Sequence, residues 1–237
     1  ADIDSDGDLD VLAAGFLGAA DNETIVWYEN TDGTGNFGPG RVIDETRDYS
    51  WVVSNIRAAD VDDDGDADVL VVGRALFSSG SDYVAWYENL SGHGTFGDKH
   101  VITRDGEVLA GLPAGGFVDA ADIDTDGDLD VVFTAGSGDK IAWHANLDGA
   151  ATFGPEQRVG SGVSSPGWTT IGDVDSDGDP DVIYEHGDNT VVWQENTNGL
   201  GTYGPQRVIT QDPDAEDMYV YTADLDGIHS FDIAVIV

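Results

Sequence analysis

Aspartates gather in short stretches of this chain that are built to one plan. The stretch "DIDSDGDLD" occupies residues 2–10, and similar stretches lie at 60–68, 122–130 and 173–181. In all four, positions 1, 3, 5 and 9 are Asp and position 6 is Gly. Alternate side chains along a tight turn can converge on one point, and Gly permits the left-handed backbone that such a turn needs. Several hard oxygen ligands around one point are suited to binding a cation.

The chemistry of the ligands favours calcium at these four acidic loops. Ca²⁺ takes 6 to 8 oxygen ligands at about 2.3 to 2.6 Å, whereas Mg²⁺ prefers a stricter octahedron with retained waters. An EF-hand begins with a similar pattern but needs a bidentate Glu at position 12 and a helix on each side. Position 12 is not Glu in any of the four loops, and it falls within an expected strand. The residues there are Ala13, Val71, Phe133 and Tyr184. The sequence therefore predicts about four Ca²⁺ sites that are not EF-hands.

Composition sets the class of protein. Asp and Glu number 47 against 9 Lys and Arg, which gives a formal net charge of -38. Such a surface repels nucleic-acid phosphates and anionic membranes, so we expect no nucleic-acid partner. No run of about 18 apolar residues is present, which argues against membrane insertion. A purely solvated acidic surface would not need Gly at a fixed place in each cluster.

The acidic loops belong to longer repeats. Their first aspartates lie at residues 2, 60, 122 and 173, with a damaged fifth copy, "DLDGIHSFD", from residue 224. Each loop precedes an apolar run, and in four repeats a motif such as "VAWYEN" and an aromatic-Gly pair follow. The runs are short and rich in β-branched and aromatic residues, which predicts about four strands per repeat.

The fold expected from this pattern is all-β. A four-stranded sheet of one repeat cannot bury both faces alone, so we predict a β-propeller of four-stranded blades. A two-sheet sandwich or a parallel β-helix is the alternative. We expect one propeller domain over residues 1–237, with repeats at about 1–48, 49–110, 111–162, 163–212 and, in part, 213–237.

These loops, each followed by an apolar strand, resemble the FG-GAP/VCBS repeats known from the calcium-binding propeller blades of integrin α-chains. The resemblance implies ligands at positions 1, 3, 5 and 9 and a backbone carbonyl at position 7. In the first two loops these are Asp2, Asp4, Asp6, Asp8 and Asp10, and Asp60, Asp62, Asp64, Asp66 and Asp68. In the next two they are Asp122, Asp124, Asp126, Asp128 and Asp130, and Asp173, Asp175, Asp177, Asp179 and Asp181. It also implies a seven-bladed ring, of which this chain would be a part completed by further blades or by copies of itself.

The fifth loop departs from the pattern. It keeps Asp224, Asp226 and Asp232, but Ile228 stands at position 5 and His229 replaces the Gly. We therefore expect weak metal binding there, or none.

Aromatic residues and sequons give further candidate sites. A Trp recurs at the same place in four repeats, which favours packing between blades over a ring of sugar-stacking platforms. Trp51 and Trp168 break the repeat and are the better candidates for ligand contact. Asn22 and Asn89 begin N-glycosylation sequons, which matter only in a eukaryotic secretory pathway.

The leading functional hypothesis is an extracellular, secreted or cell-surface, Ca²⁺-stabilised propeller. It would act in adhesion or bind a protein or glycan ligand. The five histidines show no metal spacing, and the chain has no nucleophile elbow, phosphate loop or dinucleotide fingerprint. We therefore expect no enzyme activity. A structural subunit of an extracellular filament or surface coat is one alternative, and a carbohydrate-active lyase or dehydratase is the other.

Overall fold

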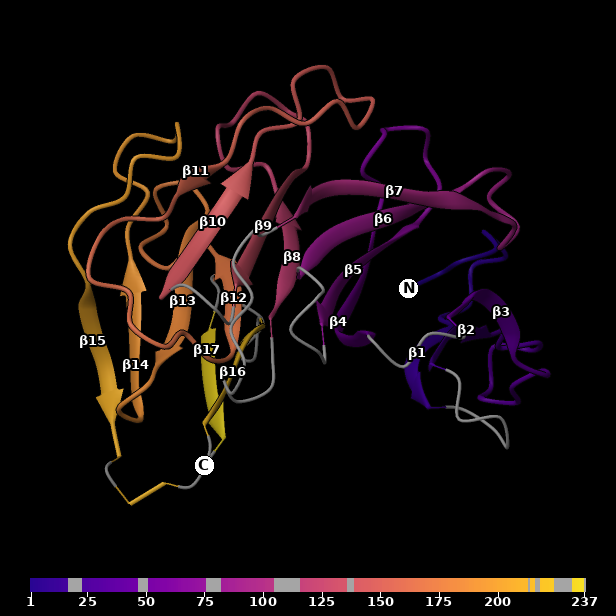
Figure 1. Cartoon of the computed structure of the whole chain (residues 1–237), viewed down its shortest axis with the longest axis horizontal. Coiled ribbons are helices and arrows are strands. Elements are labelled where there is room, and N and C mark those ends of the chain that lie inside the picture. Colours follow the sequence, from indigo (N-terminus) through magenta and orange to yellow (C-terminus); the bar gives the residue numbers. More distant parts are fainter. Residues whose placement is uncertain are drawn as a thin grey trace. The chain divides into compact units, whose positions relative to one another are not determined.

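The regular structure of the described residues is entirely β-strand. The computed structural model describes residues 1–16, 23–46, 51–75, 82–104, 116–135, 139–212, 214–215, 218–223 and 232–236. Within these ranges the chain forms antiparallel sheets whose strands follow one another in sequence (Figure 1). None of these residues forms a helix long and apolar enough to cross a membrane. The chain divides into two compact units, residues 1–112 and 113–237.

The first unit contains two sheets. A three-stranded sheet has the order β1 (Val11–Phe16), β2 (Glu23–Tyr28) and β3 (Arg41–Thr46). A four-stranded sheet follows, in the order β4 (Trp51–Ala59), β5 (Asp68–Ala75), β6 (Tyr83–Asn89) and β7 (Phe96–Arg104). Strands β1 and β4 lie against each other, so the sheets of consecutive repeats are neighbours.

The second unit contains two four-stranded sheets and a two-stranded one. The first has the strands β8 (Val118–Ala121), β9 (Asp130–Ala135), β10 (Lys140–His144) and β11 (Gln157–Arg158). The second has β12 (Thr169–Gly172), β13 (Asp181–His186), β14 (Thr190–Gln194) and β15 (Arg207–Gln211). The last pairs β16 (Tyr219–Ala223) with β17 (Asp232–Ile236). Strand β12 contacts both β8 and β16.

The middle strands of the sheets are apolar on both faces. In β5 the four consecutive residues from Val69 to Val72 are all buried, and β13 and β14 carry similar runs. A continuous apolar run indicates a strand that is covered on both sides, whereas a half-exposed strand alternates. The last strands of the sheets differ, because most residues of β15 are exposed. Each sheet therefore packs through its middle strands and meets solvent at its last strand.

The repeated tryptophans fill the space between neighbouring sheets. Trp27 and Trp143 are fully buried. A Cβ atom added to Gly94 of the following repeat would lie 2.0 Å from Cζ2 of Trp27, and one added to Gly201 would lie 2.2 Å from Cζ2 of Trp143. For these two tryptophans the prediction of packing between repeats is confirmed, and the glycine of the next turn makes the close approach possible.

The prediction of an all-β chain built from four-stranded antiparallel sheets is confirmed for the described residues. The loops of the second, third and fourth repeats join the first two strands of their sheets. The number of blades, the closed ring and the single domain stay predictions.

Candidate metal centre

The four acidic loops are held in shape by their own carboxylates. The position-1 aspartate accepts a hydrogen bond from the backbone N–H of the position-6 glycine, as from Gly7 to Asp2 at 3.0 Å. The same bond, at 3.0 to 3.1 Å, joins Gly65 to Asp60, Gly127 to Asp122 and Gly178 to Asp173. The position-5 carboxylate accepts from the N–H at position 7 in all four loops, at 2.9 to 3.0 Å.

Two residues with left-handed backbone, at positions 4 and 6, let the loop turn tightly. The position-6 glycines have φ between 94° and 103°. Position 4 also has positive φ in every loop, although its residues are Ser5, Asp63, Thr125 and Ser176, with φ between 57° and 63°. Asp tolerates this region better than most residues, whereas a β-branched residue such as Thr125 is unusual there. The sequence predicted the glycine but not the second left-handed residue.

The position-9 aspartate ties the loop to the sheet. In the fourth repeat, Oδ2 of Asp181 accepts from the N–H of Val174 at 3.0 Å, and Oδ1 accepts from the N–H of Asn196 at 2.8 Å. Asp10, Asp68 and Asp130 make the same two bonds, at 2.8 to 3.1 Å. All four side chains are buried. Because both oxygens accept backbone hydrogen bonds, this residue is a structural support of the loop in addition to a candidate ligand.

The position-3 aspartates supply the observation that tests whether a cation fits. Oδ1 of Asp4, Asp62 and Asp124 is buried and accepts no hydrogen bond, and Oδ1 of Asp122 at position 1 is in the same state. A buried carboxylate oxygen without a partner is costly unless a cation or donor satisfies it. The neighbours of these side chains are other carboxylates, which accept hydrogen bonds and donate none, so the residues present fit a hard cation.

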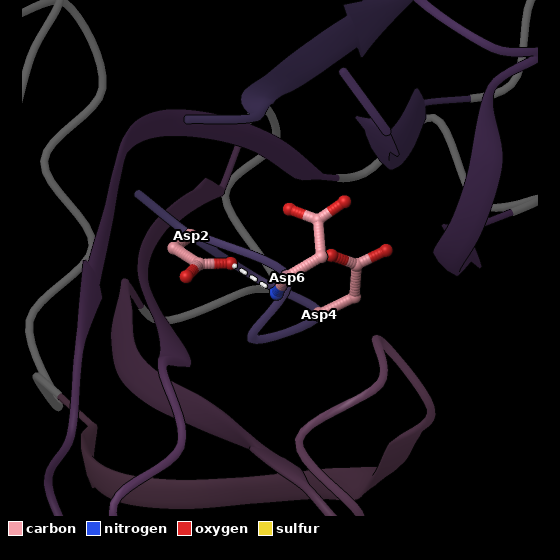
Figure 2. A group of neighbouring side chains, drawn as sticks. All are labelled: Asp2, Asp4 and Asp6. Atoms are coloured by element: carbon pink, nitrogen blue, oxygen red, sulfur yellow. Dashed lines mark hydrogen bonds between the residues drawn. The ribbon is translucent and has the colours of Figure 1, made fainter. Parts of the chain in front are cut away.

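Carboxylates from each loop come close enough to share one ion. Figure 2 shows Asp2, Asp4 and Asp6 on the single turn of the first loop, and their nearest oxygens lie within 4.8 Å of one another. In the other three loops the corresponding groups combine positions 1, 3 and 9. They are Asp60, Asp62 and Asp68, then Asp122, Asp124 and Asp130, then Asp173, Asp175 and Asp181. Asp64 and Asp126, at position 5, fall outside these groups.

The position-7 aspartates lie against the turn of their own repeat. A Cβ atom added to the turn glycine would come within 2.1 to 2.7 Å of a carboxylate oxygen at position 7. The four pairs are Gly33 with Asp8, Gly92 with Asp66, Gly149 with Asp128 and Gly199 with Asp179. The side chain at position 7 therefore points to the turn, which leaves its backbone carbonyl as the group that the family resemblance assigns to the ion.

Burial and mutual repulsion raise the pKa values of several loop carboxyls. Burial is the main cause at position 9, where it raises the pKa of Asp68 and of Asp130 to about 7 and that of Asp181 to about 6. Burial also raises the pKa of Asp4, and the charges of Asp6, Asp10 and Glu29 raise it further. A cation would offset these effects, because it favours the ionised form.

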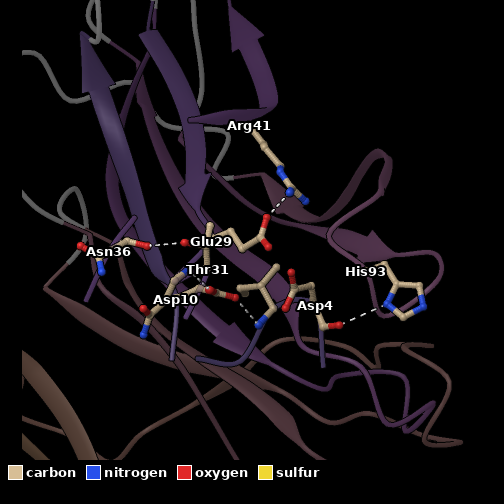
Figure 3. Close-up of polar contacts among 9 residues, drawn as sticks. Asp4, Asp10, Glu29, Thr31, Asn36, Arg41 and His93 are labelled. Atoms are coloured by element: carbon tan, nitrogen blue, oxygen red, sulfur yellow. Dashed lines mark hydrogen bonds and ion pairs between the residues drawn. The ribbon is translucent and has the colours of Figure 1, made fainter. Parts of the chain in front are cut away.

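The first and third loops are also bound by the following repeat of their unit. The side-chain Nδ2 of Asn89 donates to the backbone carbonyl of Ile3 at 2.8 Å, and Nδ2 of Asn196 donates to that of Ile123 at 2.8 Å. Nδ1 of His93 lies 3.1 Å from the Asp4 carbonyl oxygen (Figure 3). A change in loop shape is thus transmitted directly to the contact between two sheets.

Sequence reasoning missed one group of acidic residues beside the loops. Glu195, which follows β14, has a carboxylate oxygen within 4.8 Å of those of Asp175 and Asp177. Glu29 occupies the same place in the first repeat, where Figure 3 shows it between Arg41 and the first loop. The signal was present in the sequence, because Glu recurs in the "WYEN" and "WQEN" motifs of three repeats.

The remaining predicted sites have separate outcomes. Asp224, Asp226 and Asn22 lie outside the described residues, and Asp232 and Trp51 begin β17 and β4. Asn89 is fully buried and its Nδ2 donates to two carbonyls, which counts against the predicted glycosylation there. Trp168 lies in an aromatic group, with ring centroids 4.6 Å from Phe117, 5.3 Å from Tyr219 and 5.6 Å from Tyr221.

Comparison with known families agrees with this geometry. The model of the FG-GAP-like repeat matches residues 2–71 and 122–184, which together exceed half of the chain. This chain belongs to the FG-GAP-like repeat family. The matched regions contain all four acidic loops.

Two solved structures are similar to this FG-GAP-like chain. An Agrocybe aegerita lectin, described as recognising non-reducing terminal N-acetylglucosamine, matches with a TM-score of 0.61 and 22% identity. The match covers 97% of this chain and 61% of the lectin chain, so the chain spans under two thirds of that protein. The Photorhabdus luminescens Tc holotoxin pore matches with a TM-score of 0.48 and 17% identity, over 95% of this chain and 11% of that one. Comparison with curated protein sequences gave no match.

Proposed function

We propose that this chain is a calcium-stabilised, ligand-binding β-propeller module that works outside the cell. Its membership of the FG-GAP-like repeat family and its stacked four-stranded sheets support a binding module. The observation that carries the calcium part is the set of buried, unpaired Oδ1 atoms in the first three acidic loops. These atoms leave carboxylates facing one another without a donor, and a hard divalent cation is the partner that such a set suits.

The residues of each loop would bind the ion through different groups. Positions 1, 3 and 5 would supply side-chain oxygens and position 7 its carbonyl, as the family resemblance implies. The position-9 carboxylate would face the ion while it keeps the backbone N–H groups of Val174 and Asn196, or their counterparts, in place. Bound Ca²⁺ would supply positive charge that offsets the repulsion within each loop.

Calcium would act mainly on stability, because the first and third loops are also part of the contact with the next repeat. Asn89 and Asn196 fix the loop carbonyls of Ile3 and Ile123, so an ordered loop presents an ordered acceptor to the neighbouring sheet. Loops of this chemistry can be tuned to the high calcium concentrations found outside cells. This is the reason for proposing an extracellular setting.

A glycan is the ligand that we propose to test first. The Agrocybe aegerita lectin shares the fold and is described as recognising terminal N-acetylglucosamine. Aromatic rings suit the apolar faces of sugars, and the aromatic group around Trp168 includes Tyr219 and Tyr221, which are 39% and 40% exposed. We therefore place the proposed ligand contact at this group. A protein ligand is the other outcome of the test.

The experiment separates the two parts of the proposal. The thermal midpoint of the metal-depleted protein is measured with and without Ca²⁺, and binding of N-acetylglucosamine-terminated oligosaccharides is then measured by calorimetry. We expect a higher midpoint with Ca²⁺, and binding that Tyr219→Ala weakens. Phe37→Ala is the control, since Phe37 is 48% exposed but lies in the first repeat. A thermal midpoint that does not change with Ca²⁺ would overturn the calcium part of the proposal. If no member of a glycan array bound to the protein, the glycan part would be overturned.

A further inference from the structure

The glutamate after the second strand of the sheet approaches the acidic loop in the fourth repeat. Oxygens of Glu195, Asp175 and Asp177 all lie within 4.8 Å of one another. Asp175 also belongs to the group with Asp173 and Asp181, so the position-3 carboxylate is shared by both sets. Glu195 thus extends the carboxylates of the loop from a different part of the chain.

An arginine holds this glutamate from the other side. Nη2 of Arg207 on β15 is paired with Oε2 of Glu195, and the guanidinium lies 4.7 Å from the centroid of the Trp193 ring. The Arg207 side chain is 49% exposed and that of Glu195 is 21% exposed. The first repeat has the same arrangement, in which Arg41 pairs with Glu29 (Figure 3). The Arg41 guanidinium lies 4.7 Å from the centroid of the Trp27 ring.

The second repeat changes one member of the pair, and the third repeat changes both. In the second repeat Glu88 remains, and His100 replaces the arginine with its ring 5.1 Å from that of Trp86. In the third repeat the glutamate is Ala145, and Gln157 stands opposite Trp143 in place of the arginine. The basic residue is absent where the glutamate is absent, so it serves the glutamate and not the tryptophan alone.

One arginine does not balance the charges that meet in the fourth repeat. Glu195, Asp175 and Asp177 bring three carboxylates together against the single guanidinium of Arg207. An ion pair alone would not require Glu195 to lie so close to the loop. Both oxygens of Asp181 already accept backbone N–H groups, whereas Ca²⁺ takes 6 to 8 oxygen ligands. A further carboxylate beside the loop would help to complete that shell.

We propose that Glu195 is an additional side-chain ligand of the ion in the fourth loop, and that Glu29 and Glu88 have this role in the first two. The third loop lacks the ligand because Ala145 stands in its place. This inference rests on the proposed calcium binding. It predicts two classes of site in one chain, namely three tighter sites and one weaker site at the third loop.

Two variants of the full chain test the role of Glu195. Calcium binding to wild type, Glu195→Gln and Arg207→Gln is measured by titration calorimetry. Affinity rises with the number of charged ligands, so we expect roughly tenfold weaker binding at the fourth loop of Glu195→Gln. One equivalent of Ca²⁺ should move from the tight class to the weak class. Arg207→Gln breaks the same ion pair but keeps the carboxylate, so the tight class should keep three equivalents with equal or higher affinity.

The outcomes distinguish this inference from the proposal on which it rests. If wild type binds no Ca²⁺, the proposed calcium module is wrong. If wild type binds Ca²⁺ in a single uniform class, or Glu195→Gln binds as wild type does, only the role of the glutamates is wrong. Equal losses in Glu195→Gln and Arg207→Gln would show that the ion pair has a merely structural role, and would also overturn the inference.

Discussion

The third and fourth repeats of the chain both lie in the second unit. Their acidic loops follow the same pattern, but the residues around the loops differ. In both, the position-9 carboxylate accepts two backbone N–H groups, from Ile123 and Asn146 to Asp130 and from Val174 and Asn196 to Asp181. The surroundings differ at three places. The third repeat has Ala145, Gln157 and Ala151 where the fourth has Glu195, Arg207 and Gly201.

This difference separates the residues that shape the loop from the residues that adjust metal binding and the contact with the neighbouring sheet. The hydrogen bonds accepted by the position-9 carboxylate are the same in both repeats, so we infer that they serve the fold of each repeat. The residues outside the loop vary, so they are free to adjust metal binding and the contact with the neighbouring sheet. We infer that the acidic loop primarily stabilises the fold, and that its affinity for a metal ion is set by residues from the strands beside it.

The largest expected effect comes from removal of the position-9 carboxylate. Asp181→Ala leaves two buried backbone N–H groups without acceptors, each at a cost of about 1 to 3 kcal/mol, so the free energy of unfolding should fall by ~2 to 6 kcal/mol. Asp130→Ala should cost about the same, because its two bonds are the same. Urea denaturation in metal-depleted buffer measures both.

The conservative substitution provides the control for this effect. Asp181→Asn keeps one acceptor oxygen and nearly the same volume, so it should lose less than Asp181→Ala. A small loss for Asp130→Ala beside a large loss for Asp181→Ala would break the comparison, since it would show that the shared bonds do not support the two loops equally.

A pH series sharpens the comparison without mutation. The buried carboxyls of Asp130 and Asp181 have pKa values of about 7 and about 6, above the usual 3.8. The folded state thus holds their protons to higher pH than the unfolded state. Stability from these groups is complete below about pH 4 and is lost as the pH rises towards 7, by ~1 kcal/mol per group for each pH unit.

Metal and one variant check the sign and the cause. Denaturation of the metal-depleted protein should show stability falling between about pH 4 and 7, and saturating Ca²⁺ should offset the fall because it favours the ionised carboxylates. Asp130→Asn should reduce, but not abolish, the fall between about pH 6 and 7, because Asp181 has already titrated there and Asp68 still contributes. A metal-depleted protein that gains stability across this range would contradict the account.

The smallest expected effects concern the turn that meets the neighbouring tryptophan. Gly201 has φ of 71°, and an added Cβ would lie 2.2 Å from Cζ2 of Trp143, so Gly201→Ala should destabilise the protein by ~1 to 3 kcal/mol. Ala151 already has φ of 56°, so Ala151→Gly should relieve strain and leave stability equal or higher by up to ~1 kcal/mol. Thermal unfolding compares them, and a loss in Ala151→Gly as large as that in Gly201→Ala would contradict this reading.

The local parts of the site could be predicted from the sequence. Four aspartates at fixed positions with Gly7, or its counterparts, predict a tight acidic loop, because the geometry depends only on neighbours in the chain. The strands were predictable for the same reason, since runs such as Val69 to Val72 are apolar and β-branched. The packing of Trp27 followed from its recurrence at one place in each repeat.

The parts that depend on distant residues could not be predicted in the same way. The bond from Asn89 to the Ile3 carbonyl joins residues of two sheets, and nothing in either local pattern indicates it. The two backbone bonds of Asp181 made a structural support of a residue whose type suggested only a ligand. The approach of Glu195 to the loop depends on how β14 aligns with β13, which the sequence pattern does not specify.

The most direct test of the central claim is a crystal structure of the full chain grown with Ca²⁺, in which anomalous scattering locates the ions. The account predicts one ion in each of the four acidic loops, with Oδ1 of Asp4, Asp62 and Asp124 within about 2.3 to 2.6 Å of it. It also predicts that Glu195 reaches the ion of its loop, whereas the third loop completes its shell without a glutamate. Loops without ions at saturating Ca²⁺, their position-3 oxygens still unpaired, would contradict it.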